Sequence, residues 1–78
     1  MIDARRRLVD AIIAEIIEHE GTAQELAEFA HRMDVDGHHA TAETIRATSR
    51  ARRVKGLELR GNLAALAIAD HEATEGSD

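Results

Sequence analysis

The sequence predicts an all-α protein, in which a helical hairpin is followed by a long third helix and the chains assemble into an oligomeric bundle. Apolar residues recur with a helical period, and the 78 residues include no Pro to interrupt a helix. Fifteen residues are Ala, so large side chains for a core are scarce. Chains this small often gain stability by oligomerisation, and we therefore expect a homo-oligomer, most simply a homodimer.

The first helix is predicted from about Asp3 to Glu20. Its centre, LVDAIIAEII, holds aliphatic residues in two interleaved i, i+4 rows, which is a helical spacing. These rows cover about half of a helix surface, more than the contact seam of a simple coiled coil. Gly21 is expected to end the helix by adopting the left-handed conformation. The aliphatic residues are Leu8, Val9, Ile12, Ile13, Ile16 and Ile17.

The charges of this first helix oppose its own dipole. Arginines at positions 5–7 lie at the N-terminal end, and Glu18 and Glu20 lie at the C-terminal end. A second copy packed antiparallel would place the arginines beside the glutamates, and such a contact is self-complementary. The alternative is that these end charges are solvated and have little effect.

A second helix is predicted from Thr22 to Met33. Thr22 and Glu25 have the spacing of a capping box, in which each side chain bonds to a backbone N–H of the first turn. Residues 34–37, with sequence DVDG, read as a turn. The short connection at Gly21 would make the first two helices an antiparallel hairpin.

Residues 38–70 form either one long helix, which is allowed to bend, or two helices broken near Gly56. A Gly inside a helix costs only about 1 kcal/mol, which favours one helix. A helix of this length would extend past the hairpin, and its leucines would then need a second chain to cover them. We expect one helical domain over residues 1–72 and a disordered tail over residues 73–78.

The composition gives limited information on location and partners. The sequence contains no Cys and shows no signal peptide or membrane-spanning run, so a cytoplasmic protein without membrane contact is expected. The net charge of −5 argues against general binding to nucleic acids or anionic membranes.

One pattern resembles a metal site: Glu28 and His31 have the i, i+3 spacing of di-iron helices, and Glu15 and Glu18 lie on the preceding helix. Glu28 and Glu18 point away from the apolar faces and His31 lies on the flank of its helix, so neither a metal nor another cofactor is predicted. A metal-binding helical bundle therefore stays only as a second alternative. A calcium loop around Asp34 is disfavoured because its first ligand position would be an arginine.

Nucleic-acid binding is the first alternative. The segment TAQELAEFA resembles the first helix of a helix-turn-helix unit, although the turn that follows is longer than usual. A continuous helix would place a row of arginines on one face, where it could contact phosphates. The alternative without nucleic acid is that these arginines are solvated and pair with glutamates of a neighbouring chain. The row comprises Arg46, Arg50, Arg53 and Arg60.

No motif for catalysis is recognisable, so we predict a non-catalytic protein that acts by protein–protein interaction, as an adaptor, assembly factor, regulator or inhibitor. The broad aliphatic faces suggest where such contacts form. The predicted interface residues, for an oligomer or another partner, are Leu8, Ile12, Ile13, Ile16, Ile17, Leu59, Leu63 and Leu66.

Overall fold

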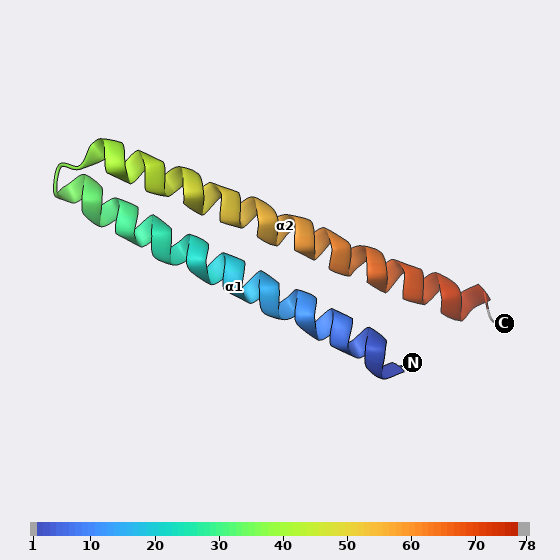
Figure 1. The fold of residues 1–78 in the computed structure, drawn as a ribbon. Coiled ribbons are helices and arrows are strands. Elements are labelled where there is room, and N and C mark those ends of the chain that lie inside the picture. The colour runs from blue at the N-terminus through green and yellow to red at the C-terminus, as the bar shows by residue number, and fades with distance from the viewer. Residues whose placement is uncertain (1, 77–78) are drawn as a thin grey trace.

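The protein is a single antiparallel pair of long helices. The computed structural model describes the backbone of residues 2–76 and the side chains of residues 3–71. Helix α1 spans Ile2–Val35 and helix α2 spans His39–Gly76. The helices lie side by side, with the loop at one end and both termini at the other (Figure 1). The all-α prediction is confirmed, and the described chain measures 63 × 19 × 12 Å, which is one layer of helices.

The prediction of three helices is wrong, because α1 continues through Gly21 to Val35. Gly21 lies inside the helix and does not have a positive φ. Its cost in a helix interior, about 1 kcal/mol, is smaller than the loss of all contacts that the following four turns make with α2. The capping-box pair Thr22 and Glu25 therefore lies in the middle of a helix.

Helix α2 is unbroken through Gly56 and Gly61, as the one-helix alternative predicted. The tail predicted at residues 73–78 overlaps the end of this helix at Gly76, and positions 77 and 78 lie outside the described residues. In the described part of the chain, neither helix has a stretch both long and apolar enough to cross a membrane.

The turn between the helices is a Schellman motif. The His38 N–H donates to the Met33 carbonyl at 2.8 Å, and the Gly37 N–H donates to the Asp34 carbonyl at 3.0 Å. Gly37 adopts a φ of +87°, the left-handed conformation that this motif requires at the residue after the cap. The sequence located this turn correctly, and the stop signal it sought at Gly21 occurs here.

The two glycines at these positions give a matched pair of substitutions. Gly37→Ala is expected to lower the free energy of unfolding by about 1 kcal/mol, because a Cβ is strained at a positive φ. Gly21→Ala is expected to raise it by about 0.5–1 kcal/mol, because its new Cβ meets no atom within 4 Å and Ala favours the helix. Urea unfolding of both variants measures this difference, and equal effects would contradict the assignment of the turn.

The contact between α1 and α2 follows a seven-residue repeat in both helices. Buried or half-buried residues recur in alternating steps of three and four, which is the pattern of a coiled coil. The helices are therefore joined along a single antiparallel seam. In α1 the seam residues are Val9, Ile12, Ile16, His19, Ala23, Leu26, Ala30 and Met33. In α2 they are Ala42, Ile45, Ser49, Arg52, Gly56, Leu59, Leu63 and Leu66.

Small residues occupy the seam in the half of the hairpin near the loop. Ala23, Ala30, Ala42 and Ser49 have at most 2% of their surface exposed, and Gly56 is also buried. The helices come close enough there for the Ser49 hydroxyl to donate to the Ala23 carbonyl across the seam at 2.7 Å. Large aliphatic residues instead fill the seam toward the open end, where Ile16 and Leu59 are buried.

Candidate interaction surface

The structure divides the predicted interface residues into two groups. One group faces the seam, where Ile16 and Leu59 are buried and Ile12, Leu63 and Leu66 are half-buried. Their contacts lie within the hairpin itself. The other group stays exposed and comprises Leu8, Ile13 and Ile17. Helix α2 thus covers Val9, Ile12 and Ile16 of α1, and it leaves Leu8, Ile13 and Ile17 at the surface.

Among residues 3–71, eight large apolar side chains have at least 40% of their surface exposed: Leu8, Ile13, Ile17, Phe29, Val35, Val54, Leu57 and Ile68. Three of them, Ile13, Ile17 and Leu57, lie on one broad side of the hairpin. Leu57 lines an open hollow between the helices with Glu20 and Gln24. Ile13 and Ile17 lie seven residues before Glu20 and Gln24, and so on the same helix face.

We call this side of the molecule the groove face. Its defining residues are Ile13, Ile17, Glu20, Gln24, Ala27, Arg53 and Leu57. Ile17 and Leu57 are each 67% exposed. Leu57 was not among the predicted interface residues, although it is one of the leucines of the long helix that were expected to need a second chain.

An ion pair crosses the groove face between the helices. Arg60 donates from Nε and Nη2 to the two carboxylate oxygens of Glu20, at 2.7 and 2.8 Å. This hydrogen bonding, together with the positive charge of Arg60, lowers the pKa of Glu20 from its ordinary value of 4.5. At the open end, Arg5 pairs with Asp70 at 2.7 Å. Arg5 and Glu20 are therefore each paired with α2 of the same chain, and antiparallel pairing with a second copy of α1 stays a prediction.

The pKa of Glu20 predicts a specific pH dependence. Because the folded state holds the carboxyl pKa below its ordinary value, the pair stabilises the protein above pH 4.5 and loses this effect as the pH falls further. The wild-type chain is expected to lose more stability below pH 4.5 than Glu20→Gln, by a small amount because the pair is exposed to solvent. Thermal unfolding of both proteins at a series of pH values measures this, and parallel curves would contradict it.

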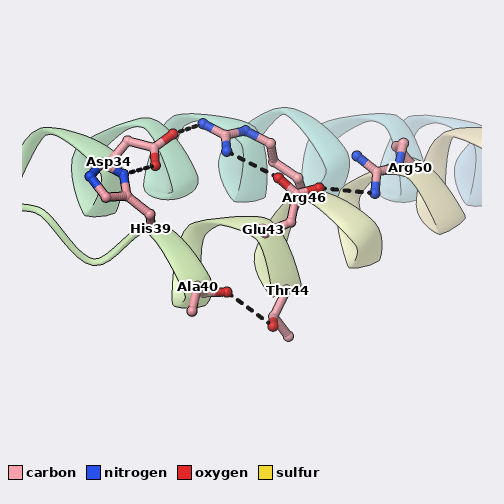
Figure 2. A network of polar contacts seen from close by, with 7 residues as sticks. All are labelled: Asp34, His39, Ala40, Glu43, Thr44, Arg46 and Arg50. Atoms are coloured by element: carbon pink, nitrogen blue, oxygen red, sulfur yellow. Dashed lines mark hydrogen bonds and ion pairs between the residues drawn. The ribbon is translucent and has the colours of Figure 1, made fainter.

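A second polar network closes the loop end of the hairpin (Figure 2). Asp34 accepts a hydrogen bond from Arg46 and contacts Nδ1 of His39 at 2.8 Å. Glu43 lies 3.5 Å from both Arg46 and Arg50. The carboxylates that face this part of the arginine row therefore belong to the same chain. The calcium-loop pattern is not realised, since Asp34 lies in α1 and Glu43 in α2.

One layer of the seam is polar. Arg52 lies 3.1 Å from Nδ1 of His19, and both residues are half-buried at seam positions. Arginine has only donors, so Nδ1 of His19 is the acceptor in this contact. The sequence alone does not identify His19 as a seam residue, because its partner Arg52 is 33 positions away.

The carboxylate and histidine pairs singled out in the sequence do not converge. Glu28 and His31 are exposed on α1, and Glu15 and Glu18 are exposed nearer its N-terminus. Among the described residues, no three His, Cys, Asp or Glu side chains lie close enough together to hold a metal ion.

Comparison of the chain with protein-family models, curated protein sequences and solved structures gives no match. A functional proposal for this protein therefore rests on the geometry of its own surface.

Proposed function

We propose that this chain is a non-catalytic helical protein that acts by binding proteins, including a second copy of itself, as an adaptor, assembly factor, regulator or inhibitor. The main support for the proposal is the exposure of large aliphatic residues on the groove face. The seam is already filled by residues such as Ile16 and Leu59, yet Ile13, Ile17 and Leu57 stay at the surface. Burying a large aliphatic side chain stabilises a complex by about 1.5–3 kcal/mol, so a partner that covers this face would bind favourably.

The polar groups around the aliphatic residues suit a protein partner. Glu20, Gln24 and Arg53 border Leu57 and supply both signs of charge and an amide. An apolar centre with a polar border is the usual arrangement of a protein–protein interface. The hollows here are open and shallow, and Ser49, which lines one of them, already donates its hydroxyl to a backbone carbonyl. These features favour binding over catalysis.

Photo-cross-linking in the native host tests the proposal. A photoreactive amino acid at position 17 is expected to give a discrete protein adduct, whereas one at the exposed neighbour Glu18, which lies off the groove face, is expected to give none. Adding Leu57→Glu should abolish the adduct, because it places a carboxylate in the apolar centre. Absence of any adduct from positions 13, 17 and 57 would overturn the proposal.

Nucleic-acid binding remains the second candidate, favoured by one hollow that is lined by Arg46, Arg50 and Arg53 together. It has less support, because Arg46 and Arg50 face carboxylates of their own chain, as Arg60 does. Salt-sensitive binding to mixed-sequence DNA that is lost in Arg50→Glu would favour this candidate over the first.

A further inference from the structure

We infer that the groove face joins two copies of this chain, packed face to face with their loops at the same end. In this arrangement α1 of each copy lies over α2 of the other, and the pair forms a four-helix bundle. The inference rests on the proposed function and deepens it, because it names the partner of the groove face and the orientation of that partner.

The positions of residues along the long axis of the hairpin, here called their heights, determine which residues would meet in the pair. His19 contacts Arg52, and Glu20 contacts Gly56 and Arg60, so the antiparallel helices place Ile17 level with the segment that holds Leu57. A two-fold axis parallel to the helices keeps each residue at its own height and exchanges the two helices. Ile17 of one copy then meets Leu57 of the other, and the symmetry forms this contact twice.

Charges on the groove face agree with this orientation. Glu20 and Arg53 line the same hollow, so they lie at similar heights on opposite helices. In the proposed pair, Glu20 of one copy approaches Arg53 of the other. An axis across the helices would instead stack α2 on α2 and bring the two arginine rows together. Like charges facing each other disfavour that arrangement.

The shape of the hairpin also favours a second layer. Helical domains generally bury their apolar faces between two packed layers, and this chain provides only one, 12 Å thick. The groove face lies on a side with an outline of 63 × 19 Å. That outline accommodates a standard interface, which buries about 800 Å² on each partner.

Cysteine cross-linking tests the inference, because the natural sequence has no Cys and each introduced thiol is unique. A short bis-maleimide is expected to join Ile17→Cys to Leu57→Cys when the two variants are mixed. Neither variant alone should give a covalently cross-linked dimer. A mixture of Glu18→Cys and Lys55→Cys, which lie on the opposite broad side, is the matched control and should give no product.

Sedimentation equilibrium of chains without Cys supplies an independent measurement. Ile17→Glu with Leu57→Glu is expected to raise the dimer dissociation constant by about tenfold or more, since carboxylates would be buried without partners. Leu8→Glu with Phe29→Glu, two exposed residues of the opposite side, should leave it unchanged. Circular dichroism checks that both variants remain helical.

Each other outcome overturns the inference. Products from Ile17→Cys alone would indicate an axis across the helices, and products from Leu57→Cys alone would indicate contact through α2. A wild-type chain that stays monomeric would exclude self-association altogether. In that case, a photo-cross-linked adduct to a different protein would leave the proposed function standing, whereas no adduct at all would remove both.

Discussion

Replacing Leu59 by Ala is expected to lower the free energy of unfolding by about 2–4 kcal/mol. Leu59 is only 6% exposed and lies in the aliphatic half of the seam, which also holds Ile16. The hairpin has one seam and no second layer within the chain, so neighbouring side chains have little means of filling the space. Chemical unfolding of the variant measures the loss.

Leu57→Ala is the matched control, because it makes the same change two residues away on the same helix. Leu57 is 67% exposed in the hairpin, so its truncation is expected to change the stability of an isolated chain by less than about 0.5 kcal/mol. Equal losses at the two positions under conditions where the chain is monomeric would show that the seam does not run through Leu59. A loss at Leu57 that grows with protein concentration would instead report the proposed dimer.

The sequence predicted the helical residues and the turn at residues 34–37 better than the length of the first helix. Helical periodicity and the absence of Pro identified the helical residues and favoured α2 as one helix, and Asp36 and Gly37 marked the actual turn. The sequence prediction wrongly divided α1 into two helices at Gly21. Gly21 gave a false stop signal, because a glycine permits a helix to end but does not require it to end. At Gly21 the residues that follow continue the same seam, so packing along the whole helix decided against a break.

The candidate surface was harder to predict for a related reason. Ile16 and Ile17 are adjacent and identical, and each belongs to an i, i+4 row. Only the register against α2 determines that Ile16 is 5% exposed and Ile17 is 67% exposed. That register depends on small residues in the other helix, including Ser49 and Gly56, which a scan for large apolar side chains overlooks.

Replacing the polar layer of His19 and Arg52 is the second change for which we expect a large effect on stability. Replacing both residues by Leu is expected to raise the free energy of unfolding by about 1–4 kcal/mol, because a half-buried polar pair gives way to aliphatic packing continuous with Ile16 and Leu59. The gain should lie toward the low end of this range, since both side chains still reach solvent. Thermal unfolding of the double variant measures it.

The single variants separate packing from pairing. His19→Leu alone leaves the half-buried guanidinium of Arg52 without its acceptor, so it should stabilise the chain less than the double variant or should destabilise it. A polar residue at a seam position also helps to fix the alignment of the helices, because any shifted register would leave it facing apolar neighbours. The double variant should therefore unfold at higher temperature but less cooperatively. An unchanged or lowered stability in the double variant would show that the polar pair stabilises this hairpin as well as aligning it.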